Sequence, residues 1–69
     1  MKILGEYIKL DSFLKLVNEA CSGGEAKVLI SEGLVSVNGE PESRRGRKLR
    51  PGDTVGIEGR FYPVEAEEA

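Results

Sequence analysis

Apolar side chains recur at steps of three and four residues between Leu10 and Cys21, which is the spacing of an amphipathic helix. The members of this stripe are Leu10, Phe13, Leu14, Val17, Ala20 and Cys21. Asp11 suits the N-cap or the first turn, where an acid meets the positive end of the helix dipole. The pattern predicts a helix over residues 10–21. It also predicts Cys21 as a small buried apolar side chain rather than a reactive thiol, since the chain has no His to act as its base.

A second helix is predicted to begin almost immediately after the first. Ser22 and Glu25 have the spacing of a capping box, in which each side chain bonds a backbone N–H of the other's segment. Gly33 is placed to end this helix in the left-handed conformation. Val28 lies outside the apolar stripe and is either exposed or in contact with another layer. The stripe itself consists of Ala26, Leu29 and Ile30.

The second half of the chain carries strand and turn signals. Residues 34–38 alternate between apolar and polar before Asn38-Gly39, a pair that favours a tight hairpin turn because both residues tolerate positive φ. Residues 50–53, Arg-Pro-Gly-Asp, indicate a type II turn with Gly at the position of positive φ. A second alternating strand follows this turn.

Four further segments complete the predicted sheet. Residues 42–49 are too polar for a core strand and predict an edge strand or an ordered loop. Residues 61–64 predict a last short strand, and residues 7–9 predict a first strand that pairs with it. Residues 65–69 predict a frayed acidic tail. Two helices followed by a small antiparallel sheet place the chain in the α+β class.

Length and composition restrict the possible functions. The chain has 69 residues, which fits one domain over residues 1–69 with its core in residues 6–64. A domain this small buries only about 60% of the unfolded surface and has no room for both a core and a deep substrate cleft. It holds one Cys and no His, which excludes a four-ligand zinc site and a disulfide within one chain. No phosphate-binding glycine loop or serine nucleophile motif is present. We expect no catalysis, no metal, no cofactor and no small-molecule substrate.

The sequence also carries signals about location. The N-terminus lacks the apolar run and the small-residue cleavage site of a signal peptide. No stretch approaches the roughly 20 apolar residues of a membrane-spanning helix. A small domain without disulfides fits a reducing compartment. We therefore expect a cytoplasmic protein with no membrane partner.

Charge is strongly segregated along the chain. There are 10 basic and 12 acidic residues and a net charge of −2, but residues 41–50 set five basic residues against Glu42 alone. The five are Arg44, Arg45, Arg47, Lys48 and Arg50. Arginine binds phosphate through a planar fork of N–H groups, so a phosphate backbone is the natural ligand. The alternative is a charged edge that prevents strands from aggregating.

Two expectations follow for the side chains in and beside this run. Glu40 and Glu42 lie beside the hairpin turn and are interpreted as solvated surface charges rather than an acid and base pair. Arg45 and Arg47 are expected to add little to stability, because exposed charges in a repulsive cluster contribute little. No apolar face accompanies the run, which argues against an anionic membrane surface.

The Ser22-Gly23-Gly24 segment combines a helix start with two glycines. Glycine costs about 1 kcal/mol relative to Ala inside a helix, so some other requirement favours both of them. One explanation is a phosphate that approaches the free N–H groups of Gly23 and Gly24, with Lys27 above it. The alternative is a tight corner between helices that needs glycine for backbone clearance.

Three motifs in this order resemble the S-four type (S4) RNA-binding domain. They are Ser-Gly-Gly-Glu-Ala-Lys at 22–27, Gly-x-Val-x-Val-Asn-Gly at 33–39 and Arg-Arg-Gly-Arg-Lys-Leu at 44–49. The resemblance spans residues 8–59 and is strongest to the small stand-alone YbcJ-like and YaaA-like bacterial branch. It implies the alpha-L motif, in which two helices pack at an angle on a small curved antiparallel sheet, and the binding of structured RNA.

The resemblance further implies an RNA surface made from both helices and the basic run. Its residues are Lys9, Lys15, Ser22, Gly23, Gly24, Lys27, Asn38, Arg44, Arg45, Arg47 and Lys48. Many larger members of the family carry Arg where this chain has Gly23, and Arg where it has Lys9. A backbone contact at the glycine pair is the expected substitute for the missing side chain. Aromatic residues are too few for a base-stacking platform, so we expect readout of phosphate and shape.

The leading hypothesis is a non-catalytic, monomeric module that binds structured RNA, either rRNA or a tRNA-like fold, including a ribosome-associated role. One alternative is a protein-interaction adaptor whose basic edge docks an acidic partner protein. Another is an accessory RNA-binding lobe for a separate RNA-modifying enzyme. Salt-dependent binding to folded RNA without a partner separates the first hypothesis from the second, and an activity change in the enzyme identifies the third.

Overall fold

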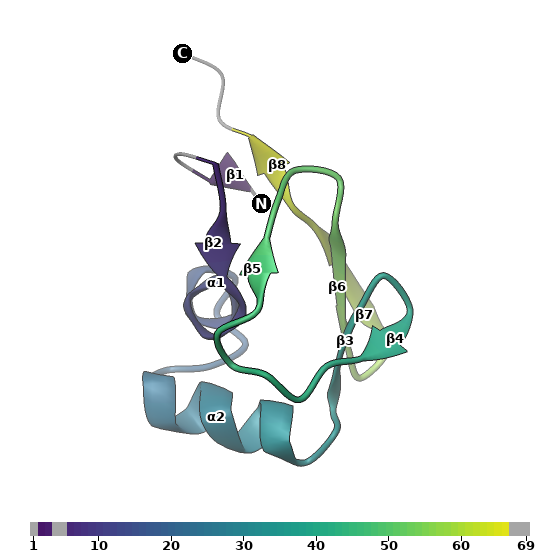
Figure 1. Cartoon of the computed structure of the whole chain (residues 1–69). Helices are drawn as coiled ribbons and strands as arrows, with labels where there is room; N and C mark the ends of the chain where they lie inside the picture. The colour runs from purple at the N-terminus through teal and green to yellow at the C-terminus, as the bar shows by residue number, and fades with distance from the viewer. Residues whose placement is uncertain (1, 4–5, 67–69) are drawn as a thin grey trace.

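In the part of the chain that the structure describes, the secondary structure elements follow in the order strand, strand, helix, helix and then six strands (Figure 1). A computed structural model of the chain describes residues 2–3 and 6–66. The helices are α1 (Leu10–Leu16) and α2 (Gly23–Ser31). The strands are β1 (Lys2–Ile3), β2 (Ile8–Lys9), β3 (Val35–Val37), β4 (Glu40–Pro41), β5 (Lys48–Leu49), β6 (Thr54–Ile57), β7 (Arg60–Pro63) and β8 (Glu65–Ala66). The predicted α+β class is confirmed.

Helix α1 is shorter than the apolar pattern predicts. It ends at Leu16, and Asn18 adopts the left-handed conformation with φ of 63°. Asn tolerates this conformation because its short polar side chain bonds locally. The chain then turns back, and the N–H of Ala20 bonds the Leu14 carbonyl at 3.2 Å. Cys21 therefore lies beyond the helix and is exposed, so the prediction of a buried Cys21 on the helical stripe is wrong.

Helix α2 begins and ends where the sequence predicts. The N–H of Glu25 donates to the Ser22 hydroxyl at 3.2 Å, which confirms Ser22 as the N-cap. Gly33 follows the helix with φ of 76°, and its N–H bonds the Ile30 carbonyl at 3.1 Å. Val28 is exposed rather than in contact with another layer. The residues that α2 turns toward the core are Ala26, Leu29 and Ile30.

The largest sheet has four antiparallel strands in the order β4-β3-β6-β7. The predicted hairpin turn is confirmed, since Asn38 and Gly39 have φ of 53° and 85°. The predicted type II turn is confirmed as well, because Gly52 has φ of 102° and the Asp53 N–H bonds the Arg50 carbonyl at 3.0 Å. These two turns flank the register in which the buried Val35 and Val37 of β3 lie opposite Ile57 and Val55 of β6.

Two further ladders have two strands each. Strand β2 pairs antiparallel with β5, with Ile8 opposite Leu49 and Lys9 opposite Lys48. The predicted pairing of residues 7–9 with residues 61–64 is wrong, because β7 already pairs with β6 across a tight turn. The segment predicted as an edge strand or a loop is a loop over residues 42–47 that ends in β5.

The C-terminal segment is more ordered than predicted. Strand β8 pairs in parallel with β1, so the backbone of Glu65–Ala66 has hydrogen-bond partners. The prediction of a frayed tail is therefore wrong at these two residues. The rest of the predicted tail, residues 67–69, lies outside the described residues.

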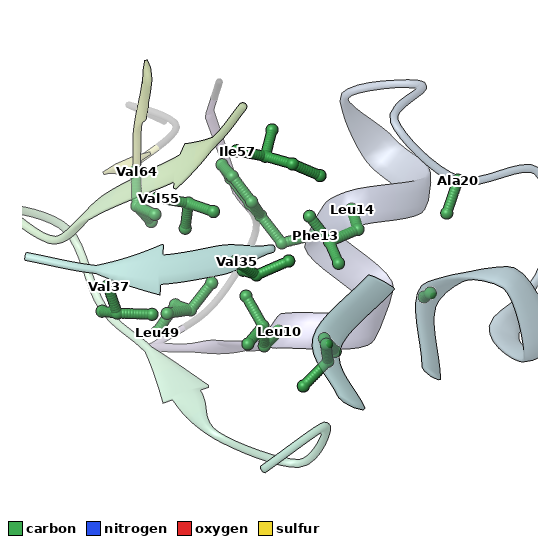
Figure 2. Close-up of a cluster of buried hydrophobic side chains, with 12 residues drawn as sticks. Leu10, Phe13, Leu14, Ala20, Val35, Val37, Leu49, Val55, Ile57 and Val64 are labelled. Atoms are coloured by element: carbon green, nitrogen blue, oxygen red, sulfur yellow. The ribbon is translucent and has the colours of Figure 1, made fainter. Parts of the chain in front are cut away.

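Side chains from both helices and from the sheets meet in one hydrophobic core (Figure 2). Figure 2 shows the α1 side chains Leu10, Phe13 and Leu14 on the side of the sheet that carries Val35. The largest fully buried side chains are Phe13, Leu10, Leu14, Ile30, Leu49, Val35, Val55 and Val64. Burial of a large apolar side chain contributes about 1.5–3 kcal/mol, so this core fixes the helices on the sheet.

A polar contact fastens the α1–α2 connection to β7. The Arg60 guanidinium donates to both carboxylate oxygens of Glu19, from Nε at 2.6 Å and from Nη2 at 3.0 Å. The Tyr62 hydroxyl donates to Glu19 Oε2 at 2.6 Å. These donors, Arg60 first, hold the pKa of Glu19 below its ordinary value. The partners lie 41 and 43 residues after Glu19, so the contact joins the helical part of the chain to the last strand of the four-stranded sheet.

Candidate nucleic-acid interface

The loop between β4 and β5, residues 42–47, is called the arginine loop and lies against the first turn of α1. The Arg47 carbonyl accepts from the Leu10 N–H at 2.8 Å, and the Arg45 carbonyl accepts from the Asp11 N–H at 3.1 Å. Lys9, the N-cap residue of α1, makes no side-chain cap bond. The loop carbonyls therefore satisfy N–H groups that a helix start leaves free. Figure 1 shows this segment running from β4 to β5 beside the start of α1.

Glu42 is the first residue of the arginine loop and binds two arginines of the same loop. Its Oε2 accepts from the backbone N–H and the Nε of Arg44, both at 3.1 Å. Its Oε1 accepts from Arg44 Nη2 at 3.1 Å and from Arg47 Nη1 at 2.8 Å. The Arg44 and Arg47 guanidinium groups lower the pKa of Glu42 to about 2. The interpretation of Glu42 as a solvated charge is wrong, because these two groups cover it and leave 8% of its side chain exposed.

The two arginines on Glu42 differ in how much of each side chain reaches solvent. Arg44 has 71% of its side chain exposed, whereas Arg47 has 33%. Arg44 therefore presents a guanidinium group whose orientation is already fixed by a carboxylate. The expectation that Arg47 adds little to stability rested on an exposed side chain, and that premise is wrong. Loss of Arg47 would remove a partner from a buried carboxylate, which is a costly change.

Arg45 connects the beginnings of the two helices. Its Nε donates to Asp11 Oδ2 in the first turn of α1 at 3.3 Å. Its Nη2 lies 3.6 Å from the position that a Cβ atom at Gly23 would take. The guanidinium group of Arg45 is thus placed beside the backbone at the start of α2.

We call Ser22, Gly23 and Gly24 the glycine corner. Within the described part of the chain, the amide N–H groups of Gly23 and Gly24 have no acceptor. Both lie at the positive end of the α2 dipole, where an anion is stabilised. A Cβ atom at Gly24 would meet only the Ser22 hydroxyl, at an ordinary 3.8 Å, so the corner does not need glycine there for clearance. This geometry favours the phosphate explanation for Gly24.

The predicted lysines occupy four different elements, β2, α1, α2 and β5. Lys9 and Lys48 face each other across the β2–β5 ladder, and both are exposed. Lys15 is exposed in the last turn of α1, and Lys27 is exposed on α2 three residues after Gly24. Among the described residues, no ion pair joins any of these lysines to a carboxylate. Their positive charge is therefore available to a ligand.

Asn38 is the predicted residue that the structure employs elsewhere. Its side-chain Nδ2 donates to Asp53 Oδ1 at 3.0 Å, and its Oδ1 accepts from the Thr54 N–H at 2.9 Å. The Arg50 N–H and the Asn38 amide hold the pKa of Asp53 below its ordinary value. These contacts tie the β3–β4 hairpin to the turn before β6. The Asn38 amide is therefore engaged within the protein rather than free for a ligand.

The structure brings most of the predicted positions to one side of the helix starts. The link is Arg45, which touches Asp11 of α1 and lies beside Gly23 of α2. Sequence reasoning missed Asp11, which binds Arg45, and Glu42, which binds Arg44 and Arg47. It also missed Tyr7, whose ring lies under the Lys48 ammonium group. Glu42 could have been found as the one acid beside a run of basic residues. Tyr7 could have been found because residues two apart in a strand lie on the same face, which places it with Lys9.

The chemistry available at this region is donation of hydrogen bonds to anions. Its groups are guanidinium forks, ammonium groups and free backbone N–H groups, all of which bind phosphate oxygens. In the residues that the structure describes, no three His, Cys, Asp or Glu side chains are placed to hold a metal ion. None of the described helices has the length and apolar character needed to cross a membrane.

Comparison with known proteins gives matches over most of the chain. The family model of the S4 domain matches residues 1–65. A "Probable ribosome maturation protein RlbA" of Bacillus subtilis (strain 168) is 57% identical over 54 residues, which span 78% of this chain and 76% of that protein. A "Putative RNA-binding protein YbcJ" of Escherichia coli (strain K12) is 38% identical over 60 residues, spanning 87% of this chain and 86% of that protein.

Two larger proteins contain a region similar to this chain. An "Uncharacterized RNA pseudouridine synthase" of Aquifex aeolicus (strain VF5) is 44% identical over 54 residues, which are 78% of this chain but 17% of the synthase. The crystal structure of the 30S ribosomal protein S4e from Thermoplasma acidophilum superposes with a TM-score of 0.61 over 84% of this chain and 30% of that one. Its sequence identity is 23%, so this likeness concerns the fold alone.

Proposed function

We propose that this chain, which belongs to the S4 domain family, is a non-catalytic module that binds structured RNA through phosphate and shape contacts. One observation carries the proposal. The Arg45 guanidinium lies beside the glycine corner, whose two free N–H groups point out from the start of α2. A phosphate seated there would accept from a charged fork and from backbone donors together. The names of the two small relatives, a ribosome maturation protein and a "Putative RNA-binding protein", support an RNA ligand.

The partner and the setting belong to the same proposal. The relative named as a ribosome maturation protein favours ribosomal RNA over transfer RNA as the ligand. The surface that we assign consists of Lys9, Lys15, Ser22, Gly23, Gly24, Lys27, Arg44, Arg45, Arg47 and Lys48, with Asn38 at its margin. The protein acts as a monomer in the cytoplasm and has no small-molecule substrate.

A second candidate function is favoured by the match to the larger synthase. A region 44% identical to this chain makes up 17% of a protein named as an RNA pseudouridine synthase. A separate chain of the same kind would then present RNA to a modifying enzyme. Adding the purified chain to such an enzyme would change its rate on folded RNA under this alternative, and would leave the rate unchanged under the leading one.

Salt dependence tests the phosphate contacts. If the surface neutralises about four to six phosphates, the logarithm of the association constant falls against the logarithm of salt concentration with a slope of about −3 to −5. The measurement is a titration of the protein against purified ribosomal RNA and transfer RNA from low to physiological salt. A slope near zero would reject phosphate recognition.

Two matched substitutions on α2 locate the phosphate. Glu25 lies in the first turn beside the glycine corner and Glu32 lies at the other end of the helix, and both are exposed. Glu25→Gln removes a negative charge near the seated phosphate and should raise RNA affinity about twofold to fivefold, or ~0.4–1 kcal/mol. Glu32→Gln removes the same charge at a distance and should leave affinity within error. Equal effects would move the phosphate away from the corner.

A further inference from the structure

The exposed face of the β2–β5 ladder carries basic residues and one aromatic ring. Along both strands the side chains alternate, so that Ile8 and Leu49 turn toward the core. The residues on the other side are exposed. We call this side the ladder face, and it consists of Tyr7, Lys9, Lys48 and Arg50.

The two lysines of the ladder face have no carboxylate partner among the residues that the structure describes. Lys9 and Lys48 are direct cross-strand neighbours, an arrangement that costs stability because like charges repel. By contrast, Arg44 and Arg47 on the adjoining loop share Glu42. An anion from outside the chain is the group that would relieve the repulsion.

Tyr7 places an aromatic ring among these cations. The Lys48 Nζ lies over the ring at 5.0 Å from its centroid, and Tyr7 has 41% of its surface exposed. The group over the ring is thus the exposed, flexible side chain of Lys48 rather than a core residue. A cation–π contact at an exposed site is weaker than the stacking of a nucleobase on an aromatic ring. A base can therefore take the place of the ammonium group, which then moves to a phosphate beside the base.

We propose that Tyr7 stacks one unpaired nucleobase of the RNA while Lys9 and Lys48 hold the phosphates on either side of that nucleotide. This inference rests on the proposed function and adds a ligand feature to it, since a paired duplex offers no base to the ring. Unpaired bases in bulges and loops are the usual targets of aromatic side chains in RNA recognition. The ladder continues into the arginine loop through Lys48, so one RNA can reach both.

The other exposed aromatic residue provides a control. Phe61 is 69% exposed on β7, but its ring lies across the sheet over Gly56, with ring carbons 3.1 and 3.2 Å from the Cβ position of that glycine. The neighbouring cation on β7, Arg60, is already bound to Glu19 at 2.6 Å. Phe61 therefore has an open ring without an available cation beside it.

The test uses three RNA hairpins that share one stem sequence and one apical loop. Their stems differ only at one site: fully paired, with one bulged adenosine, or with an abasic site at the bulge. Wild-type protein should bind the adenosine bulge about tenfold more tightly than the abasic bulge. Tyr7→Ala should abolish this preference while the affinity for the paired hairpin stays within twofold. Tyr7→Phe keeps the ring and should keep the preference, and Phe61→Ala should keep it as well.

The possible failures separate the two proposals. If the three hairpins bind with salt-dependent affinity but the base preference is absent, or survives Tyr7→Ala, the stacking role of Tyr7 is overturned and the proposed function stands. If Phe61→Ala abolishes the preference instead, the stacking site lies on β7 and the assignment to Tyr7 is also overturned. If no hairpin binds at any salt concentration, both proposals are overturned.

Discussion

The arginine loop and the β2–β5 ladder carry the same sign of charge but hold it in opposite ways. Each of the three loop arginines has a carboxylate partner inside the protein. Lys9 and Lys48 on the ladder face each other and have no such partner among the described residues. In the loop, the carboxylate partners reduce the net positive charge and fix the orientation of the arginine side chains. On the ladder, the positive charge is not reduced by such partners, and the lysine side chains remain flexible.

Two regions with similar numbers of basic residues therefore differ in how freely those side chains move. A long side chain loses rotamer freedom when it binds a ligand, and a carboxylate that already orients it reduces that loss. We therefore expect the loop arginines to serve both folding and binding, and the ladder lysines to serve binding alone. Substitutions in the loop should consequently change both the free energy of unfolding and the affinity for RNA, whereas substitutions on the ladder should change mainly the affinity for RNA.

The largest expected effect comes from Arg47→Met. This substitution leaves the buried Glu42 charge without its 2.8 Å partner, and it should lower the free energy of unfolding by about 1–3 kcal/mol. Lys48→Met is the matched control, since it removes the same charge from the next residue. It should change the free energy of unfolding by less than about 0.5 kcal/mol. Urea denaturation measures both, and equal losses would erase the distinction between loop and ladder.

The double substitution of Lys9→Gln with Lys48→Gln tests the other region. RNA affinity should fall about tenfold, and the magnitude of the salt slope should decrease by about 2, because two phosphate contacts are lost. Thermal stability should stay constant or rise slightly, since two facing like charges are gone. Lys9→Arg with Lys48→Arg keeps both charges and should keep the slope. A neutral double variant with the wild-type slope would show that the ladder does not contact phosphate.

The dependence of stability on pH provides another way to distinguish the arginine loop from the ladder, because, within the described residues, only the loop contains a buried carboxylate. The pKa of Glu42 is about 2 in the folded protein against an ordinary value of 4.5. The folded state thus binds this proton less readily than the unfolded state, so the stabilisation is present above pH 4.5 and is lost as the pH falls toward 2. The melting temperature should drop over this window, and Glu42→Gln should make the drop smaller. An unchanged drop in the Gln variant would assign the pH dependence to other carboxylates.

The smallest expected effect concerns the glycine corner. Gly24→Ala meets only an ordinary contact at 3.8 Å and should raise the free energy of unfolding by up to ~1 kcal/mol. Its methyl group would crowd the seated phosphate, so RNA affinity should fall severalfold. Gly33→Ala at the other end of α2 should instead destabilise the protein, because φ is 76° there. A more stable Gly24→Ala protein with unchanged affinity would remove Gly24 from the interface.

The parts of the fold that sequence could predict are those with local physical causes. The start of α2 could be predicted because the Ser22 hydroxyl accepts from the N–H three residues later. The turns at Asn38-Gly39 and Gly52 could be predicted because Asn and Gly tolerate the positive φ found there. The end of α1 was missed because Asn18 leaves the helix in the left-handed conformation, although the apolar period continues past it. The partner of β2 was missed because pairing across 40 residues leaves no local pattern.

The candidate site divides in the same way. Arg44, Arg45 and Arg47 could be chosen by charge alone, and the family motifs placed Ser22, Gly23 and Gly24 beside them. Orientation could not be predicted, because it depends on which acid faces which arginine after folding. Glu42 was taken for a solvated charge, since burial of a carboxylate depends on two guanidinium groups closing over it. Asn38 was chosen for its motif, but its amide closes a turn.

The carbonyl groups of Arg45 and Arg47 accept hydrogen bonds from the first turn of α1. Binding of a ligand to the arginine loop is therefore coupled to fraying of this end of the helix. The helix opens at this end only when the loop carbonyls leave the Leu10 and Asp11 amides. A ligand that holds the guanidinium groups in place must therefore slow exchange of those two amide hydrogens with solvent, although it need not touch either residue. By the same linkage, any change that unwinds this turn lowers the affinity of the arginine loop for the ligand. Two backbone amides would thus report on the state of side chains more than 30 residues away in sequence.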